Sequence, residues 1–275
     1  MKTEAGPSLA ALADRHLLYQ QSVQDVEAEI DFVEQTWSEL RRRPAGLLRE
    51  DFCGTANTSC AWVARDPKHY AIGLDLDGDV LEWGRLYKLS ELSDEQSERI
   101  ELLQEDVLRA RPGLADIILA MNFSYYLFLT RYDLLEYFEN ALDGLVSDGI
   151  LFLDAYGGYE APMVLTEPRE CKDKNNNDFT YIWEQAEFNP IDSCMTCNIH
   201  FEFPDKSRID KAFSYHWRLW TLPEIREILY EAGFSKVDIY WEGTDTVNNE
   251  GNGIYTPSET GDADPGWVCF IVAQA

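Results

Sequence analysis

Apolar residues near the start of the chain follow a helical period. Between positions 24 and 43, Val26, Ile30, Val33 and Trp37 follow one another at intervals of three or four residues. This spacing places them on one face of an amphipathic helix. The pattern therefore predicts a helix before the first strand, and a shorter helix is expected upstream of it, over 9–20.

From residue 47 onward, short apolar segments alternate with helical patterns. Strands are expected near 47–50, 71–75, 100–103, 116–121 and 150–154, and helices near 57–65, 78–91 and 132–146. A last helix over 222–232 is followed by Gly233, a typical helix stop. Alternating strands and helices indicate a parallel sheet with helices on both faces.

In the middle of the chain the period changes to two. Apolar and polar residues alternate over 195–203 and over 213–219. With 180–188, these segments predict three antiparallel strands. Loops are expected over 172–178, which is rich in Asn and charged residues, and over 242–266, which has no clear period.

Two strand ends carry acids at the spacing of a nucleoside-binding unit. Glu50 precedes the turn Cys53-Gly54-Thr55, and Asp75 ends the second strand about 25 residues later. Gly54 lacks a Cβ, so a ligand can approach the backbone there closely. A carboxylate such as Asp75 can accept hydrogen bonds from two ribose hydroxyls. With Asp51 beside Glu50, the turn disfavours a pyrophosphate and favours a ligand with a cationic end.

In these residues the chain resembles the class I S-adenosylmethionine-dependent methyltransferases. Their first motif places an acid and an apolar residue before Gly-x-Gly-x-Gly; here Glu50 and Gly54 match, and Phe52 and Ala56 replace the outer glycines. The later segments match in order along most of the chain. The residues that the resemblance assigns to the methyl donor are Tyr19, Glu50, Phe52, Cys53, Gly54, Asp75, Leu76, Asp106, Val107, Ala120 and Asn122.

The resemblance also implies the architecture. We expect a Rossmann-like methyltransferase fold: a doubly wound, mostly parallel α/β sheet of seven strands, whose last strand, over 267–273, is antiparallel. An antiparallel lid of three strands is inserted into it. The expected parts are a helical cap over 1–45, a donor-binding domain over 46–158 and 219–275, and the lid over 159–218.

Three residues are candidates for the chemistry of transfer. By resemblance, Tyr126 follows the fourth strand where a residue lies near the reacting centre. His216 is of a type whose pKa suits a general base, and Arg218 can pair with a carboxylate of the substrate. Both lie on the polar side of a lid strand. That side either faces the substrate or, in the alternative interpretation, faces solvent.

The charge of the chain limits its partners. Fifty acidic residues against 23 basic ones give a formal net charge of −27. Such a surface repels nucleic acids, whose binding depends on Lys and Arg neutralising phosphates. The basic run Arg41-Arg42-Arg43 follows the first long helix, where cations suit the negative end of the helix dipole. A small-molecule acceptor is therefore expected, and no nucleic acid.

The cysteines and the apolar runs indicate in which cellular compartment the protein is expected. The six cysteines do not suggest a disulfide framework, and no secretory segment precedes them. No apolar run approaches the ~20 residues of a membrane span. A cytoplasmic protein is expected. Cys194 and Cys197 lie in a predicted strand, where residues three apart face opposite sides, so no metal site is expected.

Together these patterns predict an S-adenosylmethionine-dependent methyltransferase that transfers a methyl group to nitrogen or oxygen of a small molecule, without a metal. Two other functions stay open at this stage. One is a nicotinamide-dependent oxidoreductase on a degenerate Rossmann fold, and the other is a non-catalytic, nucleoside-binding regulatory protein. The acceptor and the oligomeric state are not indicated by the sequence.

Overall fold

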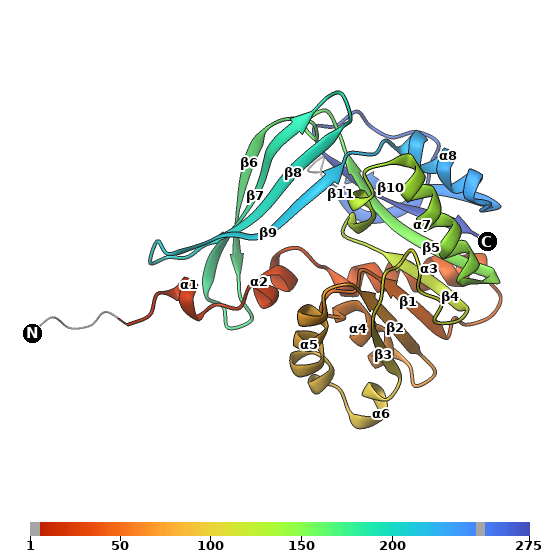
Figure 1. Ribbon diagram of the computed structural model, residues 1–275, viewed down its shortest axis with the longest axis horizontal. Helices are drawn as coiled ribbons and strands as arrows, with labels where there is room; N and C mark the ends of the chain where they lie inside the picture. Colours follow the sequence, from red (N-terminus) through yellow and green to blue (C-terminus); the bar gives the residue numbers. More distant parts are fainter. Residues whose placement is uncertain (1–5, 246–250) are drawn as a thin grey trace, which may run out of the picture. The chain divides into compact units, whose positions relative to one another are not determined.

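The computed structural model describes residues 6–245 and 251–275. Its contacts divide the chain into two compact units. The larger unit comprises Val26–Ala161 and Trp220–Ala275, and the smaller comprises Met1–Asp25 and Pro162–Leu219 (Figure 1). Each unit is built around one sheet.

The larger unit contains an eight-stranded sheet of order β11-β10-β12-β5-β4-β1-β2-β3. Its strands are β1 (Leu47–Asp51), β2 (Tyr70–Asp75), β3 (Ile100–Gln104), β4 (Ala115–Ala120), β5 (Leu145–Gly157), β10 (Lys236–Thr244), β11 (Gly251–Pro257) and β12 (Trp267–Gln274). Strands β1 to β5 pair in parallel, and β12 pairs antiparallel with both β5 and β10. The parallel strands therefore end at one edge of the sheet.

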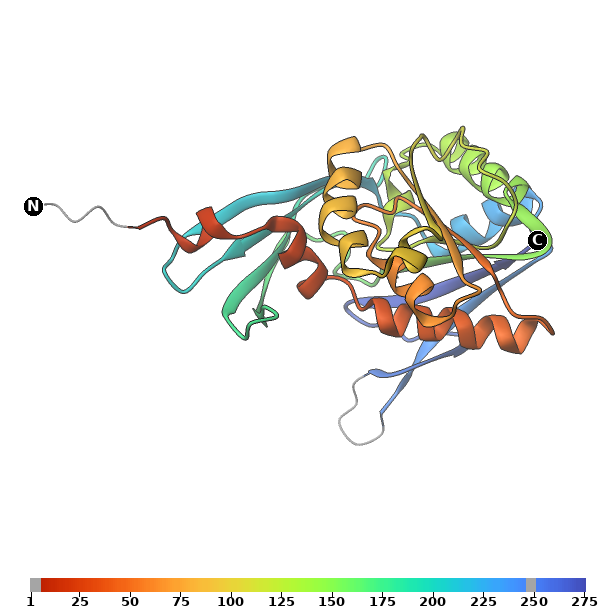
Figure 2. The same cartoon turned by 90° about the horizontal axis from the view of Figure 1, so that it is seen from below.

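Helices cover both faces of this sheet, with α3 and α7 on opposite sides (Figure 2). The helical segments are α3 (Val26–Leu40), α4 (Asn57–Arg65), α5 (Gly78–Tyr87), η1 (Leu89–Glu91), α6 (Asp94–Ser97), η2 (Ser124–Leu127), α7 (Arg131–Asp143) and α8 (Leu222–Ala232). The apolar stripe that predicts α3 is buried: Ile30, Val33 and Trp37 pack with Leu48 and Ile117 in one core cluster. Burial of this stripe, rather than helix propensity alone, stabilises α3.

The doubly wound α/β fold is confirmed, but the large sheet has eight strands and not seven. The additional strand is β11, which lies in the segment predicted as a loop over 242–266. Its sequence has two glycines and no apolar alternation, so the pattern gives no strand signal. Antiparallel pairing with β10, for example Trp241 opposite Thr256, supplies its hydrogen bonds instead.

The smaller unit contains four antiparallel strands in the order β6-β7-β8-β9, and not three. They are β6 (Leu165–Lys172), β7 (Asp178–Asn189), β8 (Cys194–Glu202) and β9 (Arg208–Arg218). The missed strand, β6, is a polar edge strand that contains Pro168. Charged residues and proline are typical of edge strands and hide the alternation that predicts interior ones.

Two short helices, α1 (Leu9–Leu12) and α2 (Arg15–Ser22), belong to the smaller unit. Leu18 of α2 packs with Phe179, Ile199 and Phe201 on the apolar face of the four-stranded sheet. Residues 1–45 are predicted from the sequence as one cap, whereas the contacts place α3, which begins at Val26, in the larger unit. Trp37 and its apolar neighbours face the large sheet, and that burial explains the boundary.

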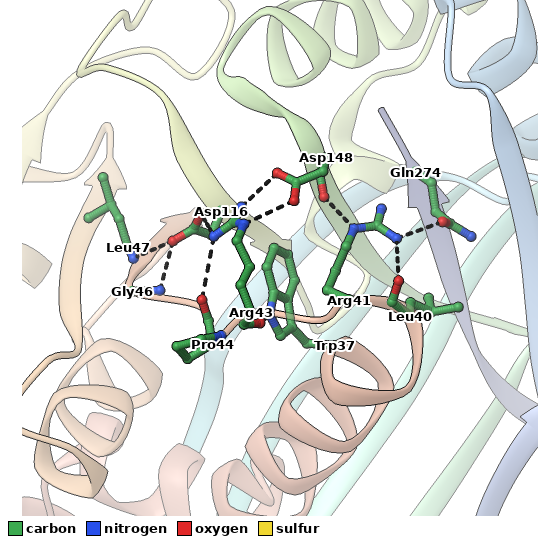
Figure 3. Close-up of polar contacts among 10 residues, drawn as sticks. All are labelled: Trp37, Leu40, Arg41, Arg43, Pro44, Gly46, Leu47, Asp116, Asp148 and Gln274. Carbon is green, nitrogen blue, oxygen red and sulfur yellow. Dashed lines mark hydrogen bonds and ion pairs between the residues drawn. The ribbon is translucent and has the colours of Figure 1, made fainter.

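Arg43, the last residue of the basic run after α3, forms two ion pairs near the start of β1 (Figure 3). The Arg43 guanidinium contacts Asp148 and Asp116, each at 2.6 Å. The Asp116 carboxylate also accepts the backbone N–H groups of Gly46 and Leu47, at 2.7 and 3.0 Å. Arg43 thus joins the end of α3 to the first residues of β1 and β4, a more specific role than the predicted interaction with the helix dipole.

Within residues 6–245 and 251–275, no helix is both long enough and apolar enough to cross a membrane. All six cysteines are free thiols, and Cys197 is buried in β8.

Candidate functional site

The loops that follow the parallel strands form the candidate site. Glu50 lies next to last in β1, Asp75 ends β2, and Ala120 ends β4. Since β1 pairs with both β2 and β4, these strand ends are neighbours. Ligands of open α/β sheets bind beyond the carboxyl ends of the strands, where neighbouring connections turn to opposite faces.

In the turn after β1, every second residue has a left-handed backbone conformation. Phe52, Gly54 and Ala56 have φ of 58°, 53° and 59°, all in the left-handed region. The Cys53 N–H donates to the Leu74 carbonyl at 2.9 Å, which fixes the turn to β2. Phe52 and Ala56 therefore adopt the conformation for which the family motif has glycine, although side chains at such positions cost energy.

Glu50 holds the beginning of α4. Its Oε2 accepts hydrogen bonds from the backbone N–H of Ser59, at 2.8 Å, and from the Ser59 hydroxyl. Ala56, at the N-cap of α4, offers no side-chain bond, so Glu50 caps the helix from the strand. The side chain is 8% exposed, and this burial raises the pKa of Glu50 to about 7. Its predicted contact with a ligand stays a prediction.

Asp75 is bonded at both carboxylate oxygens. Oδ2 accepts the Gly54 N–H at 2.8 Å, and Oδ1 accepts the Asp77 N–H at 2.9 Å. Burial raises the pKa of Asp75. Because each oxygen has a second lone pair, the carboxylate can still accept hydrogen bonds from a diol. The turn and the acid that the sequence predicts as one site are thus in direct contact.

An apolar surface lies beside Asp75. Leu76 is 67% exposed, which is high for a leucine at a sheet edge. Asp77 caps α5 through the N–H groups of Asp79 and Val80, at 2.9 and 3.3 Å. Leu76 is therefore held between two anchored residues with its side chain free to cover a flat ligand.

The loop after β3 contains the other predicted pair. The Glu105 N–H donates to the Asp75 carbonyl at 3.2 Å, which places this loop next to the end of β2. Asp106 accepts the Leu108 N–H at 3.0 Å and so forms a local turn, and Val107 is buried. Asp106 and Val107 thus lie in a segment that directly contacts the Asp75 region.

The turn after β4 is held by an acid that the sequence reasoning missed. Asn122 and Phe123 have φ of 59° and 56°, and their N–H groups donate to the Asp154 carboxylate at 2.7 and 2.8 Å. Burial raises the pKa of Asp154 to about 7. The sequence contains one sign of this role: Asp154 lies in the otherwise apolar strand segment Ile150–Ala155, where a buried carboxylate needs hydrogen-bond donors.

Tyr126 is buried after this turn. It is 0% exposed, and its hydroxyl donates to the Tyr156 carbonyl at 3.1 Å. Its ring lies 5.7 Å from that of Tyr156, and Phe123 lies 4.8 Å from the same ring. Phe123, Tyr126 and Tyr156 thus form one aromatic cluster, in which Tyr126 is fully buried.

Asp51 does not add negative charge to the turn, in contrast to the interpretation of the sequence. Its carboxylate pairs with the Arg49 guanidinium at 2.7 and 3.1 Å and accepts the Tyr137 hydroxyl at 3.0 Å. Adjacent residues of a strand face opposite sides of the sheet, so Glu50 reaches α4 and Asp51 reaches α7. The charge that weighs against a pyrophosphate is therefore that of Glu50 and Asp75.

Gly84 is a second residue that the sequence reasoning missed. A Cβ added to this glycine of α5 would lie 2.7 Å from the Thr55 carbonyl oxygen. The helix thus packs directly on the turn after β1. A glycine inside a helical pattern was the only signal, and it is typical of close packing.

The remaining predicted residues lie in the smaller unit. Tyr19 of α2 packs on Phe213, with ring centroids 5.0 Å apart, on the apolar face of the four-stranded sheet. His216 and Arg218 of β9 lie on the opposite face, since strand residues alternate. A hollow of about 530 Å³ borders His216, and its lining includes Glu187, Asp192 and Thr196.

None of the residues that line this hollow is Lys or Arg. Across the part of the chain that the structure describes, no group of three or more His, Cys, Asp or Glu side chains is placed to hold a metal ion.

Comparison with solved structures identifies proteins of the same fold. An S-adenosylmethionine-dependent methyltransferase from Clostridium acetobutylicum ATCC 824 superposes with a TM-score of 0.66 at 15% identity, covering 94% of this chain and 96% of its own. The chain has the fold of class I S-adenosylmethionine-dependent methyltransferases.

Two further structures match over nearly their whole length. CalS10, an amino pentose methyltransferase from Micromonospora echinaspora solved with S-adenosylmethionine bound, has a TM-score of 0.66 at 12% identity, with 99% of both chains covered. The sugar N-methyltransferase KedS8 from Streptoalloteichus has a TM-score of 0.65 at 14% identity, covering 100% of this chain and 96% of its own. No protein-family model and no curated protein matches the sequence.

Proposed function

We propose that this protein is an S-adenosylmethionine-dependent methyltransferase that acts on a small-molecule amine. The observation that carries the proposal is the contact between Gly54 and Asp75, which joins a left-handed turn to an acid at neighbouring strand ends. The names of the structural neighbours support the same donor and the same kind of reaction.

The residues at this edge fit an adenosyl group. The Asp75 carboxylate is fixed by two backbone N–H groups and has lone pairs left for the two hydroxyls of a ribose. Exposed Leu76 and buried Val107 provide apolar surface for a purine ring. The left-handed residues of the turn after β1 let the backbone pass close to a ligand. Glu50 and Asp75 favour a ligand without phosphates.

S-adenosylmethionine, when bound, supplies a methyl group on a positively charged sulfur. The protein has to align the acceptor with that methyl group and exclude water, since alignment alone contributes several kcal/mol. Asp154 fixes the turn at Asn122 and Phe123, which we assign to the methyl end of the site. Aromatic faces such as those of Phe123 and Tyr156 tolerate a cationic centre.

An amine is the acceptor that the smaller unit favours. The hollow beside His216 has the carboxylates of Glu187 and Asp192 in its lining and no Lys or Arg. Such a lining attracts an ammonium group and repels a substrate carboxylate. His216, which borders this hollow, is the candidate base for the proton that an ammonium group bound there has to lose before its nitrogen can act as a nucleophile. Arg218 and Tyr126 stay candidates for orienting the acceptor, and Tyr19 for the methionine end.

The decisive test of the proposal is turnover. The purified protein is incubated with S-adenosylmethionine and a panel of amino sugars, simple amines, phenols and carboxylates, and release of S-adenosylhomocysteine is measured by mass spectrometry. The expected result is turnover with at least one amine, lost or reduced in His216→Ala and retained in Arg42→Ala, a variant of an exposed residue that does not line the hollow.

Other outcomes would redirect the assignment. Turnover confined to phenols or other hydroxyl compounds would replace the amine by an oxygen acceptor. Binding of the donor without turnover over the whole panel would favour a non-catalytic protein that retains the nucleoside site. The cytoplasmic location stays a prediction from the sequence.

A further inference from the structure

One buried face of α7 carries two polar side chains. Tyr137 is 0% exposed and Asn140 is 3% exposed. They are three residues apart, so they lie next to each other on the helix surface. Buried polar groups are usually hydrogen-bonded, and these two have partners at two different strand ends of the candidate site.

Tyr137 contacts the strand that leads into the first loop. Its hydroxyl donates to Asp51, whose carboxylate is also paired with Arg49. Asp51 is the last residue of β1, and Phe52, with φ of 58°, follows it. The Phe52 ring packs on Tyr137 with centroids 5.6 Å apart. Tyr137 thus contacts both residues at the point where the chain leaves β1 and enters the turn.

Asn140 contacts the second loop. Its Nδ2 donates to the Val107 carbonyl. Val107 follows Asp106 in the loop whose first residue, Glu105, donates to the Asp75 carbonyl at 3.2 Å. One helix therefore bonds to the last residue of β1, directly before the first turn, and to the loop after β3; this turn and this loop lie on either side of Asp75.

The C-terminal end of α7 packs closely on Arg49 at Gly144. A Cβ added at Gly144, one turn beyond Asn140, would lie 2.6 Å from Arg49 Nη1. Arg49 is 1% exposed and Asp51 is also 1% exposed. A buried ion pair of this kind contributes little net stability compared with apolar residues of similar size. Its presence is better explained by the position that it gives to the turn.

We propose that Tyr137 and Asn140 are positioning residues, which set the two loops on either side of Asp75 and thereby determine the affinity for the adenosyl group. The proposal rests on the proposed function, in which those loops bind S-adenosylmethionine. Neither side chain contacts the donor in this account. Each acts through a loop: Tyr137 through Asp51 and Phe52, and Asn140 through the Val107 carbonyl.

The test separates an effect on the position of the two loops from an effect on the stability of the protein. The triple variant Arg49→Leu, Asp51→Leu and Tyr137→Phe replaces the buried polar group by apolar residues. Its free energy of unfolding is expected to equal or exceed that of the wild type. Its Kd for S-adenosylhomocysteine and for adenosine is expected to rise by the same factor, about tenfold. A purely structural role would leave both affinities unchanged in a variant of full stability.

Single substitutions keep the test independent of the triple variant. Tyr137→Phe removes one hydrogen bond with almost no change in volume, and Asn140→Leu removes the bond to Val107. In the ligand-free proteins, amide hydrogen exchange is expected to accelerate over 52–59 for the first and over 105–110 for the second. Asp116→Asn, at the opposite edge of the sheet, is the matched control: it should reduce stability and leave both the affinities and these exchange rates unchanged.

The results that would overturn the proposal are distinct from failure of the proposed function. Wild-type affinities together with wild-type exchange in Tyr137→Phe and Asn140→Leu would show that these residues position nothing. A wild-type protein that binds no adenosyl compound would instead contradict the methyltransferase assignment, and the exchange rates would still report whether α7 fixes the loops.

Discussion

The Gly54 N–H donates to the Asp75 carboxylate over 2.8 Å, so that the turn after β1 and the end of β2 form one unit. The second oxygen of Asp75 accepts the Asp77 N–H. This arrangement fixes the direction of the carboxylate before any ligand arrives. Preorganised acceptors of this kind improve binding because their orientation entropy is already lost in the free protein.

A methyl group at Gly84 should damage the turn. In Gly84→Ala the new Cβ would meet the Thr55 carbonyl oxygen at 2.7 Å, so α5 has to move away from the turn. We expect a loss of about 1–3 kcal/mol of stability, as for overpacked cores, and at least about tenfold weaker binding of S-adenosylhomocysteine. Thermal unfolding and calorimetry measure the two effects.

Gly266→Ala is the control for that variant, because a Cβ there has no heavy atom within 4 Å. It should leave both stability and affinity unchanged. If the two alanine variants had the same stability and the same affinity for S-adenosylhomocysteine, neither property would depend on the close contact of α5 with the turn.

Asp154 should affect turnover more than donor binding. Asp154→Asn keeps one acceptor oxygen but presents an amide group to one of the two N–H donors of Asn122 and Phe123. The turn after β4 then shifts, and we expect kcat to fall about tenfold while the Kd of S-adenosylhomocysteine changes by less than about twofold. Steady-state kinetics and calorimetry check this. If the Kd of S-adenosylhomocysteine rose by the same factor by which kcat falls, the turn after β4 would be part of the donor-binding site instead.

Stability should decrease as the pH rises from about 4.5 to 7. Burial raises the pKa of Glu50 from 4.5 to about 7, so the folded state retains a proton that the unfolded state releases in this window. Below the window both states are protonated, and above it the full cost of roughly 3 kcal/mol is present. Asp154, whose pKa is also raised to about 7, acts in the same direction.

Urea denaturation at about pH 5 and pH 8 measures this dependence. Glu50→Gln has no proton to lose but retains an oxygen for the Ser59 donors, so its free energy of unfolding should fall less between the two pH values. An identical fall in the variant and the wild type would mean that Glu50 does not carry the effect.

The ion pairs at the start of β1 should matter for stability alone. Asp116→Asn weakens the bonds to the Gly46 and Leu47 N–H groups and the pair with Arg43, and we expect a loss of about 1–2 kcal/mol. Arg42 is exposed and, within the described residues, makes no side-chain bond or ion pair, so Arg42→Ala should be neutral. Comparable losses in the two variants would contradict the specific role of Asp116.

The sequence predicts the large parallel sheet because buried strands and amphipathic helices have clear periods. Helix α4 spans Asn57–Arg65 and α8 spans Leu222–Ala232, both as the pattern indicates. Strands β6 and β11 lack that signal: β6 is a charged edge strand with Pro168, and β11 is held by backbone pairing to β10, which the pattern does not place either. Patterns of side chains do not report backbone pairing at an edge.

The candidate site shows a similar division. The proximity of Gly54 and Asp75 follows from strand order, which the sequence indicates. The partners of Glu50 and Asp51 do not follow from it, because two adjacent acids in a strand face different helices. Only the packing shows that Arg49 neutralises Asp51 and that Tyr137 donates a hydrogen bond to it. Asp154 and Gly84 act through contacts with residues far away in the chain, which no local pattern contains.

The central claim is that the Asp75 carboxylate and the turn at Gly54 bind the adenosyl group of S-adenosylmethionine. Calorimetric titration of the wild type and of Asp75→Asn with S-adenosylhomocysteine and with NAD tests it most directly. We expect the wild type to bind S-adenosylhomocysteine and not NAD, and Asp75→Asn to bind S-adenosylhomocysteine at least about tenfold more weakly. Equal affinity in the two proteins, or preferential binding of NAD, would contradict it.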